Sequence, residues 1–173
     1  MNKQQRGTIW GIAIGLAIAG LVAVVALAAS TDSPSVATNG PPGSLTLAEE
    51  TYDFGIVSMA NGEVTRQVTI TNDSDGPVTI RKGYTSCMCT TAYLTDGSGK
   101  RTGPFGMSGH GSGVISSANV VVKPGEQVVV ETVFDPAAHG PSGTGVARRS
   151  VYLETDSSTT PKLQFDFEAN VTP

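Results

Sequence analysis

The chain has 173 residues, and its 11 Lys and Arg against 15 Asp and Glu give a formal net charge of −4. It holds no basic stripe and no cluster of Arg with aromatic residues, which argues against nucleic acid as a partner. It also lacks the G-x-S-x-G, H-E-x-x-H and phosphate-binding loop motifs, and its only histidines are His110 and His139. We therefore expect a protein that is not an enzyme.

The N-terminal part of the chain predicts membrane targeting. Residues 1–8 carry only the charges of Lys3 and Arg6, and the apolar run 9–29 is uncharged. At about 1.5 Å per helical residue this run can cross a bilayer core of about 30 Å. The positive charges before it predict a single-pass span with a cytoplasmic N-terminus and an extracytoplasmic remainder. The alternative is a signal peptide cleaved near Ala26-Leu27-Ala28, which would give a secreted protein.

Residues 30–44 are rich in Pro, Gly and Ser and nearly free of apolar side chains. Such a composition prevents regular structure, so we expect a flexible linker here. Residues 45–173 have a common size for one folded domain. The sequence thus predicts a membrane partner for the N-terminal helix, while the protein partner of the domain stays undetermined.

The domain reads as a series of β-strands. Residues 64–71 alternate apolar or long side chains with polar ones, most of them the β-branched Thr, and residues 127–134 and 146–155 are apolar enough for buried strands. Residues 72–77, directly after the first of these strands, are typical turn residues. The last strand alternates an apolar face with a polar one, its apolar residues being Leu163, Phe165, Phe167, Ala169 and Val171. Short strands joined by turns predict an all-β sandwich.

Several short motifs follow one another in a fixed order along the domain, namely Tyr52-Asp53-Phe54-Gly55, Thr71-Asn72, Ser86-Cys87-Met88-Cys89-Thr90 and Lys123-Pro124-Gly125-Glu126. They resemble a bacterial extracytoplasmic family of unknown function whose signature is F-G, T-N, S-C-G-C-T and P-G-E. The resemblance implies an immunoglobulin-like β-sandwich of the major sperm protein and hydin type, and it implies no reaction. Two departures are Met88 in place of the family's Gly and a longer segment 92–121.

Cys87 and Cys89 are the only cysteines. In an extended strand their Cα atoms would lie about 6.6 Å apart on one face, which is near the upper limit for a disulfide. A disulfide needs a bend, which Met88 adopts less readily than Gly, so we expect a strand with two separate sulfurs. Three states stay open in an oxidising compartment: buried inert thiols, a strained disulfide, and thiolates held by a metal.

The Gly-rich stretch 103–111 carries Met107 and His110. Thiolate, thioether and imidazole together form a soft ligand set that favours copper, above all Cu(I). If this stretch folds back over the cysteines, the metal ligands would be Cys87, Cys89, Met107 and His110. His139 lies in a loop sequence, where we expect a solvated turn residue.

These observations support three functional hypotheses of different classes. The principal one is a membrane-tethered extracytoplasmic binding or structural module with an undetermined partner. The second is a copper-binding protein that uses Cys87, Cys89, Met107 and His110. The third is a thiol–disulfide redox protein, although the usual redox motif, C-x-x-C at a helix start, is absent from the sequence.

Overall fold

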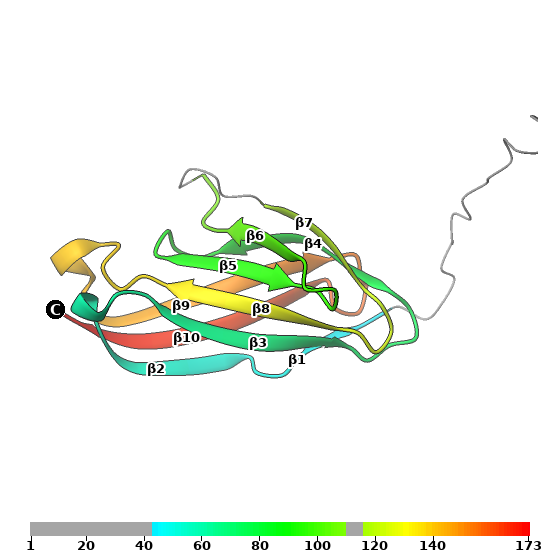
Figure 1. Cartoon of the computed structure of the whole chain (residues 1–173), viewed down its shortest axis with the longest axis horizontal. Helices are drawn as coiled ribbons and strands as arrows, with labels where there is room; N and C mark the ends of the chain where they lie inside the picture. The colour runs from blue at the N-terminus through cyan, green and yellow to red at the C-terminus, as the bar shows by residue number, and fades with distance from the viewer. Residues whose placement is uncertain (1–42, 110–115) are drawn as a thin grey trace, which may run out of the picture. The chain divides into compact units, whose positions relative to one another are not determined.

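The computed structural model describes residues 43–109 and 116–173. Within them the chain forms two five-stranded β-sheets that pack face to face (Figure 1), with strand orders β1-β3-β8-β5-β6 and β2-β10-β9-β4-β7. The strands are β1 Leu45–Leu47, β2 Thr51–Ser58, β3 Val64–Asn72, β4 Val78–Thr85, β5 Thr90–Thr95, β6 Arg101–Phe105, β7 Ser117–Val122, β8 Gln127–Phe134, β9 Gly145–Thr155 and β10 Lys162–Thr172. Two short 3-10 helices are η1 Met59–Asn61 and η2 Gly140–Gly143.

The predicted all-β sandwich is confirmed, and its two-sheet arrangement is consistent with an immunoglobulin-like fold. The expected membrane helix at 9–29 lies outside the described residues, as does nearly all of the expected linker 30–44. Among residues 43–109 and 116–173, no helix has the length and apolar character needed to cross a membrane. Membrane anchoring and the division into an anchor, a linker and a domain therefore stay predictions.

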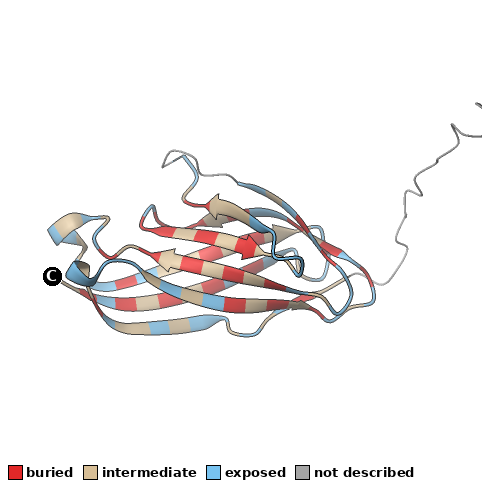
Figure 2. Ribbon diagram, viewed as in Figure 1, coloured by how far each residue is buried: buried red, intermediate tan, exposed pale blue. Residues whose placement is uncertain are grey.

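The core lies between the sheets and follows the alternation of the sequence. On β10 every residue of the apolar face is buried, as predicted, and Figure 2 shows the alternation along the central strands. Phe134 of β8 meets Phe167 of β10 with ring centroids 5.3 Å apart, so the two sheets contact through aromatic side chains. Asp166 on the polar face of β10 is half-buried, and its carboxylate accepts a hydrogen bond from Ser150 Oγ at 2.6 Å.

The long segment 92–121 contains two strands that the sequence patterns did not reveal. β6 forms a hairpin with β5, and β7 joins the opposite sheet as the neighbour of β4. Phe105 at the end of β6 is fully buried and packs directly on Gly83 of β4, where a Cβ atom would lie only 2.7 Å from the Phe105 ring. Both strands are thus part of the sandwich, and β6 contributes to its core.

The strand register shows that the turn holding Cys87 and Cys89 and the turn that begins at Asn72 lie at opposite ends of the sandwich. Thr90 and Val64 both pair with Phe134, which places the start of β5 and of β3 at the last residue of β8. Asn72 lies at the first residue of β8 instead, because its N–H donates to Glu126 O at 3.1 Å. The C-x-C turn therefore occupies one end of the sandwich and the Asn72 turn occupies the other.

Candidate functional site

Cys87 and Cys89 lie in a tight turn between β4 and β5. Thr90 N–H donates to Cys87 O at 3.2 Å, which closes a four-residue turn. The buried Thr85 hydroxyl donates hydrogen bonds to the carbonyl oxygens of Cys87 at 2.9 Å and Thr90 at 3.0 Å. These bonds hold the two ends of the turn together. The predicted extended strand is wrong at this point.

Met88 occupies a central position of this turn. Among the described residues the non-glycine positions with positive φ do not include Met88, so the turn does not need the conformation that favours Gly. Met88 is 56% exposed, so the turn presents it to solvent. The presence of Met in place of Gly therefore does not prevent the bend, which removes the reason for expecting a strand.

The two cysteines form a disulfide, with their Cα atoms 5.3 Å apart. That separation falls within the range that disulfides adopt, because the turn shortens the 6.6 Å or so of an extended strand. The expectation of two separate sulfurs is wrong, and the disulfide is one of the three states that the sequence left open. Cys87 is 9% exposed and Cys89 is 3% exposed, so the pair lies just beneath the surface.

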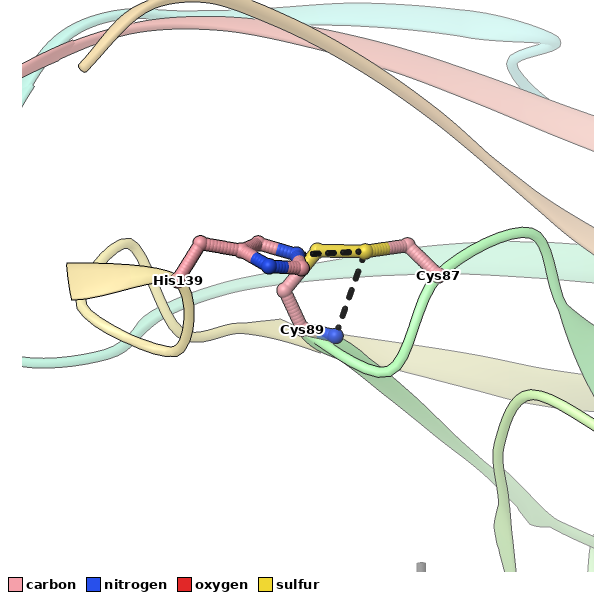
Figure 3. Close-up of side chains that lie close together, drawn as sticks. All are labelled: Cys87, Cys89 and His139. Atoms are coloured by element: carbon pink, nitrogen blue, oxygen red, sulfur yellow. Dashed lines mark hydrogen bonds between the residues drawn. A yellow bond between two sulfur atoms is a disulfide. The ribbon is translucent and has the colours of Figure 1, made fainter. Parts of the chain in front are cut away.

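His139 lies against the first of the two sulfurs. Its Nε2 atom is 3.1 Å from Cys87 Sγ, and Figure 3 shows the ring beside the disulfide. The loop after β8 is fixed by Asp135, whose N–H donates to Cys89 O at 2.9 Å and whose carboxylate accepts from Ala137 N–H at 2.8 Å. His139 is exposed, as a turn residue was expected to be, yet its ring contacts a sulfur as well as solvent.

Arg149 of β9 lies against the second sulfur. Its Nε donates to Cys89 Sγ at 3.1 Å, and its Nη1 donates to Arg148 O at 2.7 Å. The backbone next to it is held by two bonds that extend the pairing of β4 with β9, Ser86 N–H to Ser150 O at 3.0 Å and Ser150 N–H to Ser86 Oγ at 2.9 Å. The guanidinium is thus positioned by the sheet.

Each sulfur therefore has its own nitrogen partner, and the two partners differ. Cys87, the more exposed of the two cysteines, faces an imidazole. Cys89, the more buried of the two, faces a guanidinium, which is permanently charged and donates hydrogen bonds only. Cys89 N–H adds a further donor to Cys87 Sγ at 3.3 Å. Donors of this kind stabilise a thiolate, so the surroundings suit sulfur in its reduced as well as its oxidised form.

The structure brings together two of the four metal ligands predicted from the sequence. Cys87 and Cys89 meet, His110 lies outside the described residues, and Met107 is half-buried just after β6. The set of four therefore stays a prediction. The structure gathers a different set, because one ligand atom each from Cys87, Cys89 and His139 lie within 4.8 Å of one another.

Comparison with known proteins gives a match of part of the chain to a family of unknown function. Residues 45–101 match the model of a family described as "Protein of unknown function (DUF1573)". This match contains both cysteines and ends before His139 and Arg149. No curated protein matches the chain by sequence. The expected resemblance to a family of unknown function with a β-sandwich fold is therefore confirmed. That S-C-x-C-T is a signature of this family stays a prediction.

Solved structures of similar shape include a protein of unknown function from Porphyromonas gingivalis W83, with 15% identity and a TM-score of 0.55. The alignment covers 80% of this chain and 51% of that protein, so this chain spans about half of its length. The PapD-like domain 7 of human CEP192 has 15% identity and a TM-score of 0.44, with 78% and 89% covered. The likeness to the Porphyromonas protein shows the fold alone, and the expectation of a non-enzyme stays a prediction.

Proposed function

We propose that this domain takes part in thiol–disulfide exchange through the Cys87–Cys89 disulfide. The observation that carries the proposal is the pair of nitrogen contacts at 3.1 Å, His139 Nε2 on Cys87 Sγ and Arg149 Nε on Cys89 Sγ. A pair of sulfurs that only packed in the core would need neither contact. This proposal favours the redox hypothesis. The partner would be a protein that carries a thiol pair or a disulfide.

A purely structural role explains this disulfide poorly, because it closes a very short loop. On the loop-closure model a three-residue loop stabilises the folded state by only about 1.6 kcal/mol, against about 4.7 kcal/mol for a loop of about 100 residues. The bond links two residues that are 2 positions apart and already joined by a hydrogen-bonded turn. Its contribution to the fold is therefore small.

The first step of the exchange is attack on the sulfur of Cys87, the more exposed of the two cysteines. A thiolate of the partner attacks Cys87 Sγ, a new sulfur–sulfur bond forms, and the Cys87–Cys89 bond breaks. The bonding electron pair goes to Cys89, which leaves as a thiolate. Arg149 Nε already donates to that sulfur and stabilises the charge as it develops.

The second step releases the oxidised partner. A second thiolate of the partner attacks its own sulfur in the mixed disulfide, and Cys87 leaves with the electron pair. His139 Nε2 is in place to give a proton to the Cys87 sulfur. The partner has then lost two electrons and become a disulfide, while this domain holds Cys87 as a thiol and Cys89 as a thiolate, which becomes a thiol when it takes a proton from water. The reverse sequence reduces a partner disulfide, and the potentials of the two pairs decide the direction.

We also propose that the exchange takes place outside the cytoplasm, on a domain tethered by the run 9–29. Disulfides persist in that compartment, and the charges of Lys3 and Arg6 support the orientation. A reporter enzyme whose activity shows on which side of the membrane it lies, fused at Leu45, should be found outside the cytoplasm. Activity of the fusion in the cytoplasm would overturn this location.

The exchange proposal is tested by the rate at which the disulfide of the folded full-length chain, in detergent, is reduced by dithiothreitol. Arg149→Gln should slow the reaction about tenfold or more, because a hydrogen bond to a charged group contributes about 1.5–3 kcal/mol and about 1.4 kcal/mol is tenfold in rate. Arg148→Gln is the matched control, since its guanidinium bonds Glu168 at 2.7 Å instead. Equal rates for both variants would contradict the proposed role of Arg149.

A further inference from the structure

We infer that the dithiol form of the C-x-C turn binds one Cu(I) ion through Cys87 Sγ, Cys89 Sγ and His139 Nε2. The starting observation is that one ligand atom from each of these residues lies within 4.8 Å of the other two. The inference goes beyond disulfide exchange, because it needs the dithiol but no thiol partner. It also replaces the ligand set expected from the sequence with one whose members the structure brings together.

The spacing of the three atoms suits a trigonal metal site. With metal–sulfur bonds of about 2.3 Å and metal–nitrogen bonds of about 2.0 Å, the ligand atoms of such a site lie about 4 Å apart. His139 Nε2 now lies 3.1 Å from Cys87 Sγ, so the ring would withdraw by less than about 1 Å. Reduction lets the two sulfurs separate, and only side-chain rotations are then needed.

The chemistry of the ligands selects the metal. Two thiolates and an imidazole are soft ligands that favour Cu(I). Structural zinc sites take four ligands, and in residues 43–109 and 116–173 the converging group has three members. Two thiolates around Cu(I) leave one negative charge, and Arg149 Nε at 3.1 Å from Cys89 Sγ supplies one positive charge. Around Zn²⁺ the same ligands would already be neutral.

The path to the metal-bound form is simple in chemical terms. Dithiothreitol gives two electrons and two protons to the disulfide and becomes a cyclic disulfide itself. Cu(I) then displaces the two thiol protons and binds both sulfurs. His139 is exposed, so an ion or a donor molecule can approach from its side. Arg149 Nε and Cys89 N–H, which already donate to the sulfurs, would keep these bonds and orient the sulfurs toward the ion.

The test measures Cu(I) affinity of the full-length chain in detergent without oxygen, after reduction with dithiothreitol and its removal. Cu(I) is supplied as its complex with bicinchoninic acid, whose colour reports how much metal the protein withdraws. The reduced chain should bind one equivalent, and the oxidised chain and Cys87→Ser/Cys89→Ser should bind none. His139→Gln should weaken binding by at least about tenfold, since even the loss of a group that only orients a ligand weakens metal binding by that much.

Two matched variants decide between ligand sets. His110→Gln and Met107→Leu should leave the affinity unchanged if His139 is the nitrogen ligand, and X-ray absorption should show two sulfurs and one nitrogen around copper. Loss of affinity in His110→Gln with none in His139→Gln would overturn the inference, as would tight binding by the double serine variant. Disulfide reduction rates are measured without metal, so a failure of copper binding and a failure of exchange are seen separately.

Discussion

The two ends of the sandwich both bury polar or sulfur atoms, and they satisfy them in different ways. At one end Asn72 is 0% exposed, and its amide donates to Gly76 O at 2.9 Å and Val122 O at 2.8 Å. Its carbonyl oxygen accepts from Ser74 N–H at 3.0 Å. Two backbone carbonyls and a backbone N–H therefore fix this side chain within the fold.

At the other end the cysteine sulfurs contact side chains from separate elements. His139 comes from a position 52 residues away in the chain and Arg149 from one 60 residues away, and both are polar groups that could have been left in solvent. Their bonds to sulfur gain strength when the sulfur becomes a thiolate. Backbone partners fix a turn permanently, whereas polar side-chain partners respond to the state of the group that they contact.

The largest effect that follows from this comparison concerns Asn72. Asn72→Ala leaves two carbonyls and Ser74 without their partner, and each unsatisfied buried group costs about 1–3 kcal/mol. We expect the free energy of unfolding to fall by about 3 kcal/mol in a denaturant titration, with the rate of disulfide reduction unchanged. Asn170→Ala, at an exposed position on β10, is the control. A loss of reactivity in Asn72→Ala would mean that the two ends are coupled.

A smaller effect on stability, with a complete effect on reactivity, is expected at the other end. Cys87→Ala/Cys89→Ala removes the disulfide, and its free energy of unfolding should fall by no more than about 1.6 kcal/mol. Thiol labelling should be abolished and the circular dichroism spectrum retained. Unfolding of the wild-type chain with and without reductant gives the same quantity independently. A loss as large as that of Asn72→Ala would restore a structural role for the disulfide.

The sequence predicted the fold well because the relevant signals are local. The alternation on β10 and the apolar run on β8 each follow from a few neighbouring residues and the solvent. The site was harder to predict, because His139 and Arg149 reach the cysteines through the pairing of β4 with β9 and the loop after β8. The prediction of Met107 and His110 as ligands rests on their chemistry and their nearness in sequence, and neither property shows that two residues are in contact.

The shape of the C-x-C turn was missed for a different reason. A bend was expected to require Gly at position 88, but the bond from Thr90 N–H and the buried Thr85 hydroxyl hold the turn without a positive φ. The two sulfurs therefore meet in a turn that Met can occupy. The hydrogen bonds of a turn, and not the residue type at one position, decide its local geometry here.

Met88→Gly tests this explanation with a smaller effect. If the turn accepts Met without strain, Gly gains nothing from its wider conformational range and adds entropy to the unfolded chain. The free energy of unfolding should then fall by about 0.4–1 kcal/mol, and the disulfide should still form. Met88→Leu is the control for loss of the thioether. A stabilised Met88→Gly chain would show that the turn does favour the glycine conformation.

The smallest effect concerns a turn at the same end as Asn72 that is open to solvent. Asp96 lies between β5 and β6, where its carboxylate accepts from the Ser98 hydroxyl at 2.6 Å and from the N–H groups of Ser98 at 2.9 Å and Lys100 at 3.0 Å. The hydrogen bond from the Ser98 side chain, followed by the backbone bonds, lowers the pKa of Asp96. Folding thus favours the charged carboxylate.

The sign of the pH dependence follows from that direction. Because the folded-state pKa lies below the unfolded value of about 3.9, the contribution of the charge is fully present above that pH and disappears as the pH falls through the folded pKa. Asp96→Asn keeps the acceptor oxygen and removes the charge, so it should be less stable than wild type at about pH 7, and this difference should shrink as the pH falls below about 3.9. Ser98→Ala should raise the pKa of Asp96 in an NMR titration, because it removes the leading donor. A stability difference that does not shrink with falling pH would assign the effect to turn geometry, as at the uncharged Asn72, and would leave no role for charge in this turn.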